Sequence, residues 1–227
     1  MEEIRVKLQK LARGNGEYAV FNKKIINTKK EVMGVRTPDM RKLTKELTHD
    51  VTQDDILELF KQVNKDVYEE ISIIGALIGY AEISDVEKIR LIKKYLELVD
   101  NWAHIDSFVT RKMNSDEWWE FAKNCLKSPK EFVVRFGVIV MMENFLDNKH
   151  IDDVLKEQLQ IKHDGYYVKM GVAWLYATAA VKYYEKTLDS VVKLEPWTQR
   201  KALTKMIESY RFTPEQKTEI RELRAKI

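Results

Sequence analysis

The run Phe132-Val133-Val134-Arg135-Phe136-Gly137-Val138-Ile139-Val140-Met141-Met142, preceded by Ser128-Pro129-Lys130-Glu131, decides how the fold is interpreted. Its β-branched residues alone would suit a strand. The run is long for a strand, however, and Ser128 followed three residues later by Glu131 is the pattern of a helix capping box. The sequence therefore predicts a helix that is buried on nearly every side.

Helix-start signals of the same kind recur along the chain, where a capping side chain precedes proline or acidic residues. They are Thr37-Pro38-Asp39, Thr52-Gln53-Asp54-Asp55, Ser84-Asp85-Val86-Glu87, Ser115-Asp116-Glu117 and Thr213-Pro214-Glu215. By this pattern three of the four prolines begin helices, and only Pro196 lies in a connection between two helices. No Asn-Gly turn separates alternating apolar runs, so we expect no sheet.

The pattern predicts an all-α fold with about a dozen helices of about 10–19 residues, joined by short turns. Consecutive helices pair about every 35–45 residues, which is the period of HEAT-like repeats. We therefore expect a curved α-solenoid of stacked antiparallel helix pairs with an extended concave surface. No linker interrupts it, so residues 1–227 are predicted to form a single domain.

Composition narrows the classes of protein that fit. No apolar run approaches the ~20 residues of a membrane span, and Met1-Glu2-Glu3-Ile4-Arg5 lacks the apolar region of a secretion signal. The single cysteine, Cys125, fits a reducing cytoplasm. The net charge is only +3, but residues 1–50 carry 12 Lys/Arg against 7 Asp/Glu, whereas residues 51–110 carry 6 against 12. Such an uneven distribution fits a basic face or simply solvated helix surfaces.

The most informative short motif is Asp100-Asn101-Trp102-Ala103-His104-Ile105-Asp106. In a helix, Trp102 and Asp106 would lie one above the other, because residues four apart share a face. An indole beside a carboxylate suits an electron-poor or cationic ring or sugar. The alternative is structural, with Asp100 or Asp106 facing a helix N-terminus and Trp102 in the core.

Three further features have both a structural and a functional interpretation. Arg135 lies within the apolar run and needs a partner, either a nearby acid or a phosphate or Asp106. Trp174 shares a helix face with Tyr167 and Gly171, and Gly171 is predicted to clear space beside the indole, although ordinary core packing also fits Trp174. A basic cluster is a phosphate-contacting patch or a solvated face. It comprises Lys23, Lys24, Lys29, Lys30, Arg36, Arg41, Lys42 and Lys45.

The residues of standard metal and nucleophile motifs are missing. There is no His-Glu-x-x-His, Cys-x-x-Cys or Gly-x-Ser-x-Gly sequence, so neither metal nor nucleophilic catalysis is expected. The four histidines are scattered along the chain and are expected at helix ends or turns. They are His49, His104, His150 and His163.

Four segments in order resemble the AlkD-like DNA alkylation repair proteins, which are bacterial HEAT-like glycosylases. The segments are Met33-Gly34-Val35-Arg36-Thr37-Pro38-Asp39-Met40-Arg41-Lys42-Leu43, then Asp100 to Asp106, then Glu131-Phe132-Val133-Val134-Arg135-Phe136-Gly137, and Tyr167-Val168-Lys169-Met170-Gly171-Val172-Ala173-Trp174. The resemblance covers essentially the whole chain.

This resemblance implies a hydrolase that releases cationic N3- or N7-alkylated purines from duplex DNA held in the concave groove, with no cofactor and no metal. Asp106 resembles the catalytic carboxylate, and Trp102 and Trp174 resemble its aromatic walls. Arg135 resembles the backbone contact, and Lys169, Arg36, Arg41 and Lys42 are expected to bind DNA as well. A cytoplasmic monomer acting on alkylated duplex DNA is the expectation. The alternative is a non-catalytic helical scaffold that binds DNA weakly or holds a protein partner.

Overall fold

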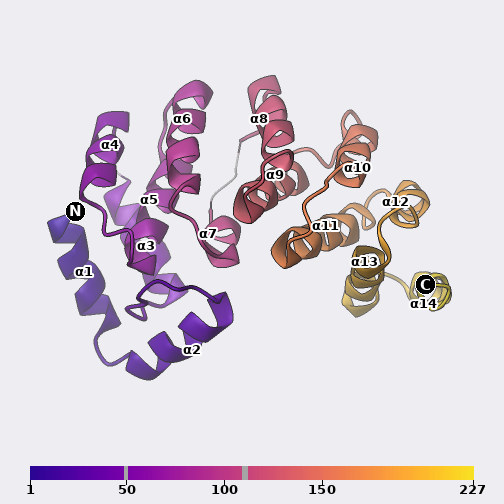
Figure 1. Cartoon of the computed structure of the whole chain (residues 1–227), viewed down its shortest axis with the longest axis horizontal. Helices are drawn as coiled ribbons and strands as arrows, with labels where there is room; N and C mark the ends of the chain where they lie inside the picture. The colour runs from indigo at the N-terminus through magenta and orange to yellow at the C-terminus, as the bar shows by residue number, and fades with distance from the viewer. Residues whose placement is uncertain (49–50, 109–111) are drawn as a thin grey trace. The chain divides into compact units, whose positions relative to one another are not determined.

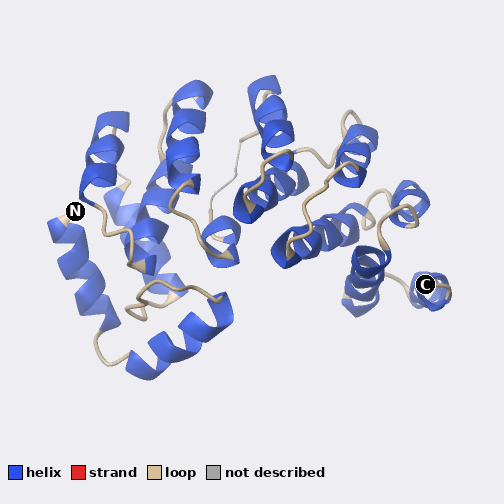
Figure 2. Ribbon diagram, viewed as in Figure 1, coloured by secondary structure: helices blue, strands red, loops and turns tan. Residues whose placement is uncertain are grey.

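A computed structural model describes residues 1–48, 51–108 and 112–227, and its described part is all-α (Figures 1 and 2). No strand occurs in these residues, and Glu31 and Val67 form only an isolated parallel bridge. The helices are α1 (Glu2–Ala12), α2 (Gly16–Ile26), α3 (Thr37–Leu47), α4 (Gln53–Gln62), α5 (Tyr68–Tyr80), α6 (Asp85–Leu96), α7 (Trp102–Asp106), α8 (Asp116–Leu126), α9 (Glu131–Asn144), α10 (Ile151–Leu159), α11 (Tyr166–Ala179), α12 (Tyr184–Val191), α13 (Pro196–Glu208) and α14 (Pro214–Ala225). The predicted fold class is confirmed, and most of the described helices have the expected length, with 10 to 14 residues. The helices α7, α10 and α12 are shorter, with 5, 9 and 8 residues.

The first of two compact units, Met1–Arg111, is built around α5. This helix packs against α3, α4, α6 and α7, because its sequence is apolar on nearly every side. Five of its apolar side chains have no exposed surface: Ile71, Ile73, Ile74, Leu77 and Ile78. Burying side chains of this size stabilises a fold by about 1.5–3 kcal/mol each. The core of this unit is therefore a single apolar helix surrounded by amphipathic ones.

The second unit, Lys112–Ile227, is a succession of helices that pack on their neighbours. Helix α9 packs against α8 and α11, and α13 packs against α11 and α14. The run that sequence analysis singled out is α9, whose residues from Val134 to Met142 are all buried. This arrangement, in which helices bury their apolar sides on sequence neighbours, is that of an α-solenoid.

The predicted helix starts are confirmed at Thr52, Ser84, Ser115 and Thr213, each of which directly precedes its helix. Thr52, Ser84 and Thr213 each accept a hydrogen bond from the backbone three residues on, and the side chain there returns it. The prediction at Ser128 was wrong: α9 begins at Glu131 after Lys130, and the Ser128 hydroxyl accepts from the Lys130 backbone N–H instead. Likewise α3 begins at Thr37 itself, so the position before the helix is Arg36.

Two prolines exchange the roles that the sequence suggested for them. Pro196 was expected in a connection, but it is the first residue of α13, and Pro129 lies in the connection before α9. Helix α13 is capped by the Glu195 carboxylate, which accepts from the backbone N–H groups of Trp197 and Thr198 at 2.9 and 2.8 Å. A glutamate cap is not among the usual residues at this position, and this hid the helix start.

A buried carboxylate holds the loop that leads into α3. Glu69 of α5 has no exposed surface and accepts hydrogen bonds from the backbone N–H groups of Met33, Gly34 and Val35 at 3.0, 2.9 and 3.3 Å. Gly34 adopts a φ of +93°, which L side chains rarely adopt. The Met33-Gly34-Val35 segment is therefore a backbone cradle around a buried acid, and it fixes where α3 starts.

In residues 1–48, 51–108 and 112–227, no helix is both long enough and apolar enough to cross a bilayer.

Candidate active site

The short helix α7 presents Trp102 and Asp106 together. They are its first and last residues, four apart, and both side chains are partly exposed. The predicted shared face is therefore confirmed, and Trp102 is not a core residue. The indole N–H donates to the carbonyl of Ile25 at 3.3 Å, so the C-terminal end of α2 fixes the ring. Asp106 lies at the C-terminus of its own helix, where it cannot serve as the N-terminal cap.

The other acid of the motif, Asp100, has the structural role. Its carboxylate accepts from the hydroxyl of Thr28 at 2.6 Å and from the backbone N–H of Lys29 at 3.3 Å. Asn101 then caps α7, because its side-chain oxygen accepts from the His104 backbone N–H at 3.1 Å. The two acids of the motif thus differ: Asp100 ties the loop after α2 to the start of α7, and Asp106 ends the helix at a partly exposed position.

His104 is the centre of a buried network that holds α7 in place. Its Nδ1 lies 3.0 Å from the Asn101 side-chain nitrogen, and its Nε2 lies 3.1 Å from the Tyr68 carbonyl. Its own carbonyl accepts from the Tyr95 hydroxyl at 3.0 Å, and the Tyr68 ring stacks on the imidazole at 4.6 Å between centroids. These partners fit a neutral ring that accepts at Nδ1 and donates at Nε2.

Burial keeps that imidazole neutral. Desolvation lowers the pKa of His104 to about 4, and this outweighs the opposing effects of the Tyr68 carbonyl and the nearby Asp100 carboxylate. His104 was expected with the other histidines at helix ends or turns, and its role in this network was not predicted. Its position between Trp102 and Asp106 was a signal, but its partners come from α5 and α6.

The basic residues expected near the start of the chain are exposed. Arg41 and Lys42 lie on the solvent side of α3, and Arg36 lies just before that helix. The Arg36 guanidinium carbon is 4.6 Å from the centroid of the Tyr18 ring, so a cation–π contact orients it. Lys30, in contrast, donates to the carbonyl of Lys65 at 2.6 Å. The cluster therefore contains exposed cations and at least one, Lys30, that is hydrogen-bonded within the protein.

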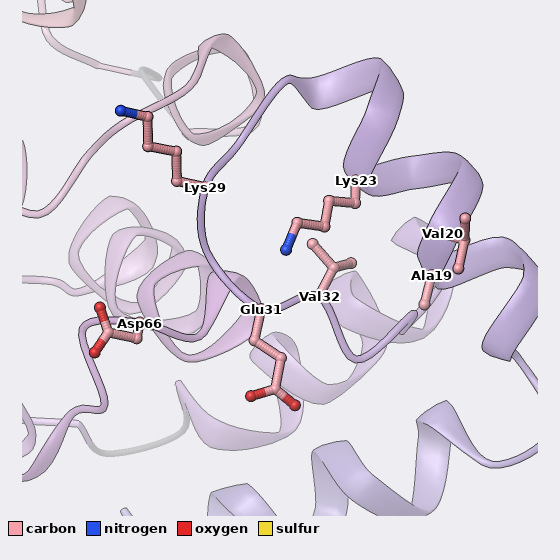
Figure 3. A pocket seen from close by; sticks show the side chains of 7 residues that line it. All are labelled: Ala19, Val20, Lys23, Lys29, Glu31, Val32 and Asp66. Atoms are coloured by element: carbon pink, nitrogen blue, oxygen red, sulfur yellow. The ribbon is translucent and has the colours of Figure 1, made fainter.

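A shallow depression of about 470 Å³ lies beside part of this cluster (Figure 3). In Figure 3 the Lys23 side chain extends from α2 toward Val32, and the carboxylates of Glu31 and Asp66 lie on the other side of the loop. The depression is lined by Ala19, Val20, Lys23, Lys29, Glu31, Val32 and Asp66. Two lysines are balanced there by two acids, so the depression is no anion site.

In the second unit, two side chains of α9 form hydrogen bonds with the backbone of one residue of α11. The Glu131 carboxylate accepts from the backbone N–H of Tyr167 at 2.7 Å, and the Arg135 guanidinium donates to the carbonyl of the same residue at 2.5 Å. Arg135 is only 5% exposed. Its position therefore stabilises the α9–α11 contact, and this link was not foreseen because it depends on packing between helices.

Trp174 is partly exposed on α11, seven residues after Tyr167 and on the same face. The core interpretation of Trp174 is therefore wrong. The expected role of Gly171 is also wrong: a methyl group there would meet the Arg135 Nη1 at 3.3 Å and a Val138 methyl at 3.6 Å, and the indole is not among its nearest neighbours. Gly171 makes room for the guanidinium, which explains how an arginine fits into the α9–α11 contact.

Lys169, on the same helix, is held by acids. Its Nζ lies 3.3 Å from Asp164 and 3.7 Å from Glu195, and about a quarter of its side chain is exposed. A phosphate would have to compete with these two carboxylates for the ammonium group.

The remaining histidines do not gather. His150 contacts Asp147 at 2.9 Å, and His163 contacts the Pro129 carbonyl at 3.2 Å, whereas His49 lies outside the described residues. Within residues 1–48, 51–108 and 112–227, no group of three His, Cys, Asp or Glu side chains is placed to hold a metal ion.

Of the predicted site residues, the first unit brings together Trp102 and Asp106, and the second contains Arg135, Lys169 and Trp174. Comparison with protein families gives a match over residues 5–209 to the family described as DNA alkylation repair enzyme. None of the curated proteins compared with the chain matches it.

Proposed function

Since this chain belongs to the DNA alkylation repair enzyme family, and hence has a role in DNA repair, we propose that it releases cationic N3- or N7-alkylated purines from duplex DNA. The observation that carries the proposal is the pair Trp102 and Asp106, partly exposed on one short helix. Asn101 caps this helix, and His104 ties it to α5 and α6, so the position of the pair is fixed by buried neighbours.

The chemistry follows from the charge of the lesion. An alkylated purine carries a positive charge, so the C1′–N9 bond can break with its electron pair leaving on the base, which departs neutral. The positive charge then develops on the sugar, where the Asp106 carboxylate stabilises it electrostatically. Water adds at C1′ and gives up a proton, so that an abasic site remains.

The aromatic residues would add to this stabilisation. An indole face attracts a cation by about 0.5–2 kcal/mol, depending on how fully the site excludes water. Trp102 supplies such a face beside Asp106, and we assign the second to Trp174. We also propose that residues 1–227 act as a single HEAT-like domain and as a monomer.

Exposed cations would bind the DNA phosphates, and in the first unit these are Arg36, Arg41 and Lys42. Arg135 would support the DNA backbone indirectly, because its guanidinium donates a hydrogen bond to the Tyr167 carbonyl. Lys169 would exchange Asp164 or Glu195 for a phosphate.

We expect duplex DNA to bind without strong sequence preference and with an affinity that falls steeply with salt. Each phosphate contact contributes a slope of about −0.9 in a plot of log affinity against log salt concentration. The double variant Arg41→Ala, Lys42→Ala should therefore reduce the slope by up to about 2. Fluorescence anisotropy with a labelled duplex at several salt concentrations measures this.

The matched control for that double variant is Lys61→Ala, because Lys61 is exposed but already pairs with Glu58 at 2.8 Å. Its slope should equal that of the wild type. An unchanged slope in the double variant would remove these two residues from the interface.

The proposed activity is tested by incubating the protein with methylated duplex DNA and measuring released bases by chromatography. We expect 3-methyladenine or 7-methylguanine, and no uracil from a uracil-containing duplex, because uracil leaves without the help of a positive charge. Salt-dependent duplex binding without any base release would instead support a non-catalytic scaffold. Efficient uracil release would contradict the charge-based mechanism.

A further inference from the structure

Four aromatic rings form a row along the N-terminal ends of α9, α11 and α13. Phe132, Tyr167 and Trp197 are each the second residue of their helix, and Tyr166 joins the last two. The centroids are 5.5 Å apart from Phe132 to Tyr167, 5.1 Å from Tyr167 to Tyr166 and 5.7 Å from Tyr166 to Trp197. We call these four residues the aromatic row; it lies entirely within the second unit.

The row is accessible to solvent. Tyr166 is 56% exposed, and Phe132, Tyr167 and Trp197 are partly exposed, so none belongs to the buried core. Single exposed apolar side chains are common, but contiguous exposed aromatic residues mark surfaces that bind a ligand or partner. The packing of the second unit therefore leaves this row available.

The backbone under two of the rings is held in place. Both backbone polar groups of Tyr167 are held by Glu131 and Arg135, and the Trp197 backbone N–H is held by Glu195 at 2.9 Å. A backbone that is held before binding loses little conformational freedom when a ligand stacks on the rings it carries. The same contacts place carboxylates at the starts of α11 and α13, so these helix ends do not bind phosphate. The faces of the aromatic rings are the surface that remains for a ligand.

Cations accompany the row. The Lys201 Nζ lies 5.6 Å from the Trp197 ring centroid, and Lys201 is exposed. Lys130 immediately precedes α9, and Lys162 lies in the exposed segment before α11. Aromatic faces interleaved with lysines are the combination that binds a strand of nucleic acid, in which bases stack and phosphates pair with cations.

From this arrangement we propose that the aromatic row binds unpaired nucleotides of a DNA strand. The bases in a duplex have both faces covered by their neighbours, so only unstacked bases offer a face to Tyr166 and Trp197. Binding of this kind uses residues of the second unit, whereas the Trp102–Asp106 pair belongs to the first, and it does not depend on base release. It would let the protein favour DNA with single-stranded segments.

The test is fluorescence anisotropy with a labelled oligothymidine, compared with a blunt, fully paired duplex. Tyr166→Ala and Trp197→Ala should each weaken binding of the oligothymidine by about 5- to 100-fold, the usual range for losing one base–aromatic stack. Duplex binding should not change. Tyr166→Phe should keep the wild-type affinity, because the ring and not the hydroxyl is used.

The matched control is Tyr210→Ala. Tyr210 is fully exposed and has Lys217 5.8 Å from its ring centroid, but it lies outside the row. Its removal should leave both affinities unchanged. The proposal is wrong if Tyr166→Ala binds oligothymidine as the wild type does, or if it weakens duplex and oligothymidine equally. Tyr166 is exposed enough for its variant to fold, and a thermal unfolding curve checks that.

The outcome is separable from that of the proposed activity. Base release from a blunt methylated duplex should be the same in the wild type and in Tyr166→Ala. A chain without glycosylase activity can still show the oligothymidine result, and an active one can fail it.

Discussion

The free energy of unfolding should fall by on the order of 3 kcal/mol as the pH drops from about 6.5 to about 4, because of His104 alone. In the unfolded chain this histidine binds a proton below about pH 6.5. In the folded protein, burial lowers its pKa to about 4, so the ring stays neutral throughout that interval. Unfolding therefore takes up a proton, and acid favours the unfolded state. The loss is complete once the pH is below the folded pKa.

Protonation would also break the network directly. The Asn101 side-chain nitrogen and the His104 Nδ1 are 3.0 Å apart, and two donors cannot share that contact. We therefore expect the helix that carries Trp102 and Asp106 to be among the first parts of the chain to lose its structure in acid.

Urea unfolding at a series of pH values measures the effect. The variant His104→Gln should be less stable than the wild type at pH 7 but should lose less stability between pH 6.5 and pH 4. His163→Gln is the control and should retain the full dependence. The His163 ring contacts the Pro129 carbonyl at 3.2 Å and the Gly165 backbone N–H at 2.9 Å, and it is not buried. Parallel curves for the wild type and His104→Gln would show that His104 is not the titrating group.

Which parts of the fold can be predicted from sequence depends on how local their causes are. The capping boxes at Thr52 and Ser84 involve residues three apart, and the buried helix α9 follows from its own composition. The starts of α9 and α13 were misplaced because the rule expects small hydroxyl or amide caps. In the structure Glu195 caps α13, and the Ser128 hydroxyl bonds only within its turn.

The site divides in the same way. The shared face of Trp102 and Asp106 was predictable, since both lie on one turn-and-a-half of helix. The role of His104 was not, because Tyr68 and Tyr95 reach it from other helices. Nor was the grip of Glu131 and Arg135 on Tyr167, which depends on how α9 and α11 pack. Local spacing reveals pairs on one helix, but it does not reveal which side chains hold that helix in position.

The largest effect is expected from Asp106→Asn. The substitution keeps the size of the side chain and removes its negative charge. If that charge stabilises a cationic sugar in the transition state, base release should fall by about 10²–10³-fold, the usual cost of losing one such electrostatic contact. Duplex affinity should hold or rise, because a charge that repels phosphates is removed. The melting temperature should change little, since asparagine keeps the size and much of the hydrogen-bonding capacity of the side chain.

A matched control tests whether the effect comes from the loss of a negative charge at position 106 or from the loss of any negative charge in this unit. Asp54 is exposed in the first turn of α4, in the same unit of the chain. Asp54→Asn removes one negative charge as well, and it should leave base release unchanged.

Single-turnover release of 7-methylguanine from a duplex that carries one such base tests the role of Asp106 most directly, with wild type, Asp106→Asn and Asp54→Asn compared at pH 7. We predict release by the wild type and by Asp54→Asn at equal rates, and release by Asp106→Asn that is slower by about 10²–10³-fold at an unchanged melting temperature. Equal release by Asp106→Asn and the wild type, or a variant that loses stability while its folded fraction keeps full activity, would contradict the assignment of Asp106 as the catalytic carboxylate.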